Sequence, residues 1–178
     1  GTKPQARLIV REEAESCNMP YVNSRWLGGF LTNFDTIKKS VRHYLGLKES
    51  VASGLFEQIS KKEASMITKE IGKLEKNLLG ISAMNKLPAA IFVVDAKREL
   101  IAVKEAVRLN IPVIAIADTD ADPYLISFPI PANDDAVRSV KLIMKKITTA
   151  IKEGQAAAPQ EIEQVIPVEA IVEEPAKA

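Results

Sequence analysis

The fold of this chain is decided by one stretch, residues 88–119, which reads PAAIFVVDAKRELIAVKEAVRLNIPVIAIADT. Two short apolar runs in it, residues 89–94 and 113–117, are each followed by an aspartate. Apolar runs of this length without polar alternation are typical of parallel strands that are buried on both faces. The stretch therefore predicts a strand, a crossover helix and a second, parallel strand, with the right-handed connection that such units adopt.

The helix is expected at residues 96–110, between the two runs. Apolar residues recur there at the spacing of one helical face, and Asn110 followed by Pro112 suits the end of a helix. The remaining positions are charged, and the pattern predicts that they face solvent: Lys97, Arg98, Glu99, Lys104, Glu105 and Arg108.

The same stretch resembles a signature of a known family, the ribosomal protein S2 family of the small subunit, whose eukaryotic relative is the laminin-receptor precursor. The matching residues are Pro88, Ile91, Phe92, Val93, Asp95, Glu99, Val103, Glu105, Asn110, Ile111 and Pro112. Four further blocks resemble that family in the right order: residues 25–29 (RWLGG), 31–34 (LTNF), 128–131 (FPIP) and 133–136 (NDDA). Together the blocks cover most of residues 1–151.

The resemblance implies a three-layer, flavodoxin-like α/β fold with a parallel sheet and an inserted antiparallel α-helical hairpin, or coiled coil. It implies a cytoplasmic, non-enzymatic constituent of the small ribosomal subunit that needs no cofactor. Such a protein binds ribosomal RNA, supports subunit assembly and helps to dock neighbouring proteins, including the large messenger-binding first protein of the subunit. It also implies that a preceding segment with a central strand is absent from this chain. Departures from the family pattern at Pro4, Tyr124, Ser127 and Ala132 put local RNA contacts and loop geometry in doubt.

Composition and charge set wider limits on the class of protein. The 178 residues, 47% of them apolar, suffice for one sizeable core. The net charge is +1, but residues 150–178 carry a net charge of −4, which leaves +5 on the remainder. A mildly basic body permits phosphate binding without requiring it. Cys17 is the only cysteine, so neither an intrachain disulfide nor a cysteine-clustered metal site can form, and no apolar run approaches membrane-spanning length.

Two heptad-like seams predict the helical hairpin at about residues 34–80, projecting from the α/β domain of residues 1–151. The lysines and arginines outside these seams are RNA-binding candidates, or they are ordinary surface charges of a solvated coiled coil. The hairpin candidates are Lys38, Lys39, Arg42, Lys61 and Lys62. His43 beside the seam lacks ligand partners at a suitable spacing and is expected to be structural. Residues 152–178, rich in alanine, proline and glutamate, are expected to form a disordered tail.

Three more RNA-binding candidates lie in the N-terminal part: Lys3, Arg25 and Trp26. A guanidinium beside an indole can pair with a phosphate and stack on a base, although a sole tryptophan can equally belong to the core. Gly28 and Gly29 lack the remaining residues of a phosphate-binding loop. A short strand is expected at residues 20–22, before this turn.

The aspartates after the two central strands leave an alternative function open. Asp95 and Asp118, with Asp120, could hold magnesium for phosphoryl transfer, because open α/β sheets place ligands at the carboxyl ends of their strands. No nucleophile, lysine or phosphate loop accompanies them, so they can instead cap the following turns. A calcium loop at residues 118–129 fails because Pro123 and Pro129 replace its glycine and glutamate.

A last strand is expected at residues 127–130, at an edge that tolerates Pro129 and Pro131. Asn133 then suits the N-cap of a final helix. The residues by themselves thus predict a binding module rather than an enzyme. The resemblance favours ribosomal RNA as its ligand, and an RNA-independent protein-interaction module that uses the hairpin is the second alternative.

Overall fold

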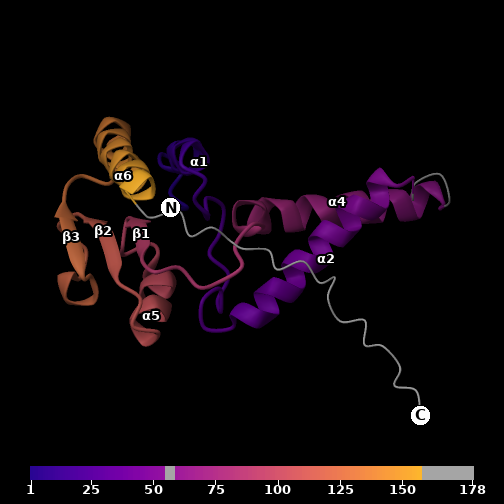
Figure 1. Ribbon diagram of the computed structural model, residues 1–178, viewed down its shortest axis with the longest axis horizontal. Helices are drawn as coiled ribbons and strands as arrows, with labels where there is room; N and C mark the ends of the chain where they lie inside the picture. The colour runs from indigo at the N-terminus through magenta and orange to yellow at the C-terminus, as the bar shows by residue number, and fades with distance from the viewer. Residues whose placement is uncertain (55–58, 158–178) are drawn as a thin grey trace, which may run out of the picture.

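The computed structural model describes residues 1–54 and 59–157 (Figure 1). In chain order the elements are α1 (Arg7–Ser16), α2 (Phe34–Ala52), α4 (Lys61–Leu78), η1 (Leu79–Ile81), β1 (Ile91–Val94), α5 (Leu100–Arg108), β2 (Val113–Ala117), η2 (Pro123–Leu125), β3 (Phe128–Pro131) and α6 (Val137–Ala157).

The three strands form one parallel sheet in the order β1, β2, β3. Ile91 of β1 lies opposite Val113 of β2, and Ile116 of β2 lies opposite Ile130 of β3. The strand, helix and parallel strand predicted for residues 88–119 are therefore confirmed. The edge position predicted for the proline-containing strand is also confirmed, since a proline in a ladder costs least where its missing amide needs no partner.

Alternate residues of the sheet enter two different cores, which makes the domain three-layered. Val93, Val113 and Ala115 pack with α5, whereas Val94 and Ile116 pack with α1 and α6. Figure 1 shows α5 on one side of the sheet and α1 and α6 on the other. This arrangement confirms the predicted flavodoxin-like α/β class, because strands buried on both faces need no polar alternation.

Helix α5 is shorter than predicted, and its charged residues do not all face solvent. It begins at Leu100, after turns over residues 96–99. The prediction that Glu99 and Glu105 are solvent-facing is wrong, since both are buried. The predicted helix end is confirmed: Asn110 has φ +55°, and the amide of Ile111 reaches the carbonyl of Ala106 at 2.9 Å, as in a Schellman motif.

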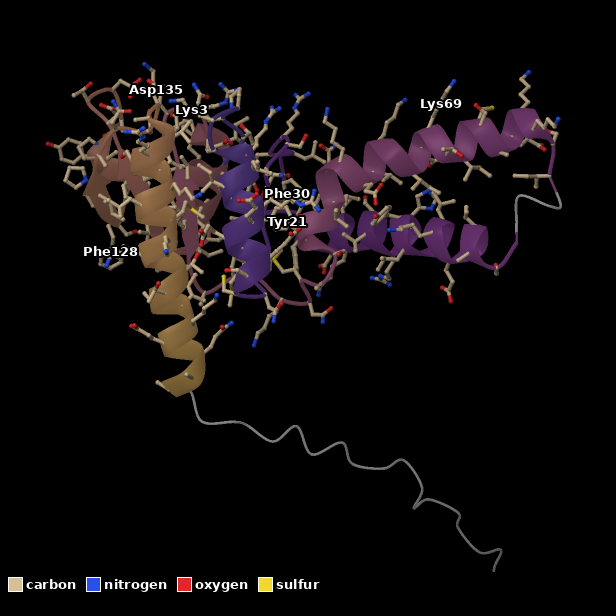
Figure 2. The ribbon with its side chains drawn as sticks, turned by 90° about the horizontal axis from the view of Figure 1, so that it is seen from above. Lys3, Tyr21, Phe30, Lys69, Phe128 and Asp135 are labelled. Atoms are coloured by element: carbon tan, nitrogen blue, oxygen red, sulfur yellow. The ribbon has the colours of Figure 1, made fainter. Side chains whose placement is uncertain are left out.

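Helices α2 and α4 form the predicted helical pair, joined to the domain by a small core of their own. Phe30, Tyr44, Leu78 and Ile81 are its buried residues. In both views the pair projects sideways from the sheet (Figures 1 and 2). A coiled coil is not confirmed, because Tyr44 and Leu78 are the only buried side chains that α2 and α4 contribute among the described residues. Two helices without a third layer leave most of their seam half-exposed.

Three expectations near the ends of the elements need correction. Residues 20–22 form no strand: the Tyr21 amide donates to the Gly80 carbonyl in η1 (2.9 Å) and the Val22 carbonyl accepts from the Gly1 ammonium (2.9 Å), but these isolated bonds form no ladder. Asn133 accepts hydrogen bonds from the amides of Asp135 and Ala136, but the regular helix starts only at Val137. Helix α6 continues to Ala157, so residues 152–157 are helical rather than part of a tail. The rest of the predicted tail, residues 158–178, lies outside the described residues.

Within residues 1–54 and 59–157, no helix combines the length and the apolar character that crossing a bilayer requires.

Candidate nucleic-acid interface

The loop that carries Arg25 and Trp26 is held by a single buried carboxylate. Glu105 of α5 accepts hydrogen bonds from the backbone amides of Gly29 (2.8 Å), Leu31 (2.9 Å) and Thr32 (3.2 Å). It also accepts one from the indole of Trp26 (3.2 Å) and one from the Thr32 hydroxyl (3.2 Å). Burial by itself raises the pKa of Glu105, but the hydrogen bonds outweigh it and hold the pKa below its usual value. Glu105 is therefore ionised at neutral pH, and its carboxylate holds the loop in place.

Trp26 has a structural role and one accessible side. Its half-buried ring packs against both the core under α5 and the core of the helical pair. The Phe30 ring lies 5.0 Å away, tilted by 58°. Trp26 also lines a cleft beside Arg25, so the core interpretation accounts for part of the ring and leaves part of it able to contact a ligand.

That cleft has a volume of about 700 Å³ and lies between the Arg25 loop, the end of α4 and the turn before α5. Five cationic side chains line it, and we refer to it as the cationic cleft: Arg7, Arg25, Lys73, Lys76 and Arg98. Its one acidic lining residue, Glu99, accepts a hydrogen bond from the amide of Thr2 at 2.6 Å. The cleft therefore offers a concentration of positive charge suited to an anionic ligand.

Two of the five cations are held in place by the same residue. The Nε of Arg7 donates to the Thr2 carbonyl at 2.9 Å, and the Nε of Arg98 donates to the Thr2 hydroxyl at 3.3 Å. Within residues 1–54 and 59–157, neither guanidinium uses its two Nη atoms in a hydrogen bond, so these atoms are available to a ligand. The cleft is therefore partly preorganised, which lowers the entropic cost of binding.

Lys3, a predicted RNA-binding residue, lies in an ion-pair cluster instead. Its ammonium is 3.2 Å from Asp95, 2.7 Å from Asp134 and 2.6 Å from Asp135, and its side chain is 12% exposed (Figure 2). Burial lowers the pKa of Lys3, but the three carboxylates more than compensate and raise it above its usual value. The cluster ties the N-terminal segment to the ends of β1 and β3. Among the side chains that the structure describes, the charge of Lys3 is therefore already compensated, unlike that of the cations in the cleft described above.

The structure does not bring the other candidates together. Lys38 lies over the Phe34 ring at 4.8 Å, and Lys39 and Arg42 are exposed at the domain end of α2. Lys61 and Lys62 are exposed at the far end of the pair. Along the axis of α4 they lie about 20 Å from the end of the helix that borders the cleft, at a rise of 1.5 Å per residue. Lys73 and Lys76, which line the cleft, lie outside the predicted seams of the helical pair but are not among the residues predicted to bind RNA. The sequence shows that these two lysines are three residues apart and so share one helical face. It does not show that Arg25 lies close to them.

The carboxylates of the magnesium alternative are occupied by protein groups. Asp95 accepts a hydrogen bond from the amide of Arg98 and pairs with Lys3, and Asp120 pairs with Lys97 at 3.1 Å. A hydrogen bond from the amide of Thr119 is the main cause that lowers the pKa of Asp118. Over the part of the chain that the structure describes, no three acidic, histidine or cysteine side chains are grouped as metal ligands.

His43 pairs with Glu70 at 3.1 Å, as a surface contact between α2 and α4.

The fold and the cleft define an α/β protein with an inserted helical pair and a cationic binding surface. Comparison with known proteins identifies the family: the sequence model described as "Ribosomal protein S2" matches residues 1–154, and the chain belongs to that family. The predicted family is thereby confirmed. It is a family of structural ribosomal proteins, not of enzymes.

Individual relatives agree with this assignment. The chain is 52% identical over 155 residues to small ribosomal subunit protein uS2 of Dictyoglomus thermophilum, covering 87% of this chain and 63% of the relative. It is 54% identical over 154 residues to that of Borrelia duttonii (86% and 61%) and 53% identical over 161 residues to that of Wolinella succinogenes (90% and 59%). The chain spans about three fifths of the length of these relatives.

Proposed function

We propose that this chain is an RNA-binding constituent of the small ribosomal subunit and that the cationic cleft holds a phosphate-bearing part of the ribosomal RNA. The observation that carries the proposal is the convergence of five cationic side chains from four parts of the chain on one cleft in a member of this family. The elements concerned are α1, the loop before α2, α4 and the turn before α5.

The chemistry of the lining suits RNA better than a small anion. Guanidinium groups bind phosphate oxygens through two parallel hydrogen bonds, whereas lysines act as point charges. Several separated cations match a chain of phosphates rather than one. Trp26, with its accessible side in the same cleft, adds a surface on which a base can stack.

Ionic-strength dependence of binding tests the proposal. The triple variant Arg25→Gln, Lys73→Gln and Lys76→Gln is compared with Lys141→Gln and Lys145→Gln on α6, which lies beyond α1 from the helical pair in both views (Figures 1 and 2). The probe is small-subunit ribosomal RNA of Dictyoglomus thermophilum. We expect the slope of log K against log salt to fall by roughly 0.7–0.9 for each lost phosphate contact in the cleft variant. An unchanged slope in the cleft variant, with the α6 variant reduced instead, would contradict the site.

Trp26 needs a separate comparison, because its removal also affects folding. Trp26→Ala should weaken RNA binding by roughly 1–3 kcal/mol if a base stacks on it, with little change in the salt slope. It should also lower the free energy of unfolding, because the ring fills space between two cores. Binding is therefore calculated for the folded fraction, measured by circular dichroism in the same buffer. Normal affinity of that fraction would leave Trp26 with a purely structural role.

The same proposal includes support of subunit assembly and docking of the messenger-binding first protein. What supports it is the family membership alone. Capture of the purified first protein by this chain, with and without ribonuclease treatment, is the test. Capture that survives ribonuclease supports direct docking, and capture that is lost shows that RNA bridges the two proteins. No observation favours the phosphoryl-transfer alternative, because lysines already pair with Asp95 and Asp120.

A further inference from the structure

Four lysines lie in one line along the outer face of α4. Lys62, Lys69, Lys73 and Lys76 are separated by seven, four and three residues, which places them on the same face of a helix. We call them the α4 lysine row. All four are exposed, and the row extends for about 21 Å at 1.5 Å per residue. Figure 2 shows Lys69 pointing away from α2.

The acidic residues of α4 all lie on other faces and have partners. Glu63 caps the start of the helix through Ser60, Glu70 contacts His43, and Glu75 accepts hydrogen bonds from Tyr44 and Lys48. No lysine of the row has an ion-pair partner among the residues that the structure describes. The row therefore presents uncompensated positive charge to solvent.

Gly72 lies beside the α4 lysine row, at the edge of its face next to Lys76, where helix stability would favour alanine. A Cβ atom added at Gly72 would meet no atom of the described protein within 4 Å, so internal packing does not require glycine. Glycine inside a helix is less favourable than alanine, because it loses more conformational freedom when the helix forms. Gly72 also lines a second groove, of about 550 Å³, which shares Arg7, Ser24, Lys76 and Asn77 with the cationic cleft.

We propose that the α4 lysine row and Gly72 form an RNA backbone site: one strand lies along α4, passes close over Gly72 and enters the cationic cleft. This inference rests on the proposed RNA-binding function and adds the path of the RNA strand to it. The lysines contact successive phosphates, and the missing side chain at Gly72 lets the sugar-phosphate backbone approach the helix. Glycine serves this purpose wherever another backbone comes close.

The experiment compares substitutions at two helical glycines. Gly72→Ala and Gly72→Leu are matched with Gly46→Ala and Gly46→Leu on α2, where an added Cβ also meets nothing within 4 Å. Stability by urea unfolding and affinity for Dictyoglomus thermophilum small-subunit ribosomal RNA are both measured. Alanine at either site should stabilise the fold. Only the Gly72 variants should bind RNA more weakly, because a side chain there keeps the RNA backbone away from the helix. The expected loss is roughly fivefold for alanine, which is about 1 kcal/mol, and larger for leucine.

Three outcomes separate the inference from the proposed function. RNA binding by the parent chain with equal affinities for the Gly72 and Gly46 variants would overturn the backbone site and leave the proposed function intact. Destabilisation by Gly72→Ala would also overturn it, because the glycine would then be needed by the fold. Failure of the parent chain to prefer this RNA over an unrelated RNA of equal length would overturn the proposed function itself.

Discussion

At the scale of single residues, Glu105 has the greatest influence on the candidate interface. It accepts five hydrogen bonds from the loop of residues 26–32, although it belongs to α5 and is more than seventy residues away in the sequence. A carboxylate is the one side chain that accepts so many bonds and donates none. The loop that carries Arg25 and Trp26 is therefore ordered by a charge in the domain core, not by its own sequence.

Glu105→Gln should lower the free energy of unfolding by about 1–3 kcal/mol at pH 7. The amide group of glutamine is a donor and would face the amides of Leu31 and Thr32, which are donors too. Urea unfolding measures the change, and Glu12→Gln on the exposed face of α1 is the matched control. Equal stability of the two variants would show that water replaces the carboxylate without cost.

The pH dependence of this difference has a fixed sign. Because folding lowers the pKa of Glu105, its contribution is present above the unfolded pKa of about 4.3 and is lost as pH falls through the folded value. The stability gap between the parent chain and Glu105→Gln should stay constant from about pH 5 to 8 and narrow below about pH 4. If this difference in the free energy of unfolding instead became larger at low pH, the pH dependence would have to come from a group other than Glu105.

At the scale of elements, the helical pair is attached to the domain by tight contacts at its base. Tyr44 and Leu78 are almost completely buried there, and the carbonyl of Gly80 accepts a hydrogen bond from the Tyr21 amide. A Cβ atom at Gly80 would lie within 3 Å of the Tyr21 carbonyl oxygen and ring. The position of α4, and with it Lys73 and Lys76, thus depends on a glycine outside the helix.

Gly80→Ala should therefore destabilise the protein by about 1–3 kcal/mol, the usual cost of overpacking. It should also weaken RNA binding by the folded fraction, because displacement of Tyr21 and the end of α4 moves the cleft lysines relative to Arg25. Gly28→Ala is the control, since a Cβ there meets nothing within 4 Å. Thermal unfolding and RNA titration of both variants provide the measurements, and parental behaviour of Gly80→Ala would refute the close contact.

At the scale of the whole molecule, the net charge of residues 158–178 is opposite in sign to that of residues 1–157. Residues 158–178 contain five glutamates and one lysine, so they carry −4 of a chain whose total is +1. Charges within about 10 Å of a surface act on its ligands at 0.1 M salt and are screened beyond that distance. From net charge alone, we expect these acidic residues to reduce the electrostatic attraction of the protein for RNA.

Ending the chain after Ala157 should raise RNA affinity severalfold at about 0.05 M salt, because the net charge changes from +1 to +5. The gain should disappear as salt rises to about 0.5 M, where screening is nearly complete. Replacing the five glutamates with glutamine in the full chain is the matched control and should reproduce the effect. A gain that persists at high salt would show that charge is not its cause.

The sequence by itself determined the parts of this protein whose causes are local. Unbroken apolar runs fixed the buried parallel strands, prolines fixed the edge position of β3, and Asn110 fixed the end of α5. The heptad-like spacing likewise indicated the helical pair. In each case neighbouring residues alone decide the conformation or the buried face.

Only the tertiary structure decided which charges are buried and which meet. Glu105 is buried because its donors come from residues 26–32, and Lys3 is largely shielded from solvent because its carboxylates come from residues 95–135. The cationic cleft joins α1, the Arg25 loop, α4 and the turn before α5, which are distant in the chain. Helical periodicity distinguishes the faces of one element, but it does not show which partner covers a face. Burial of a charge depends on that partner, and so the interface could not be read from the sequence.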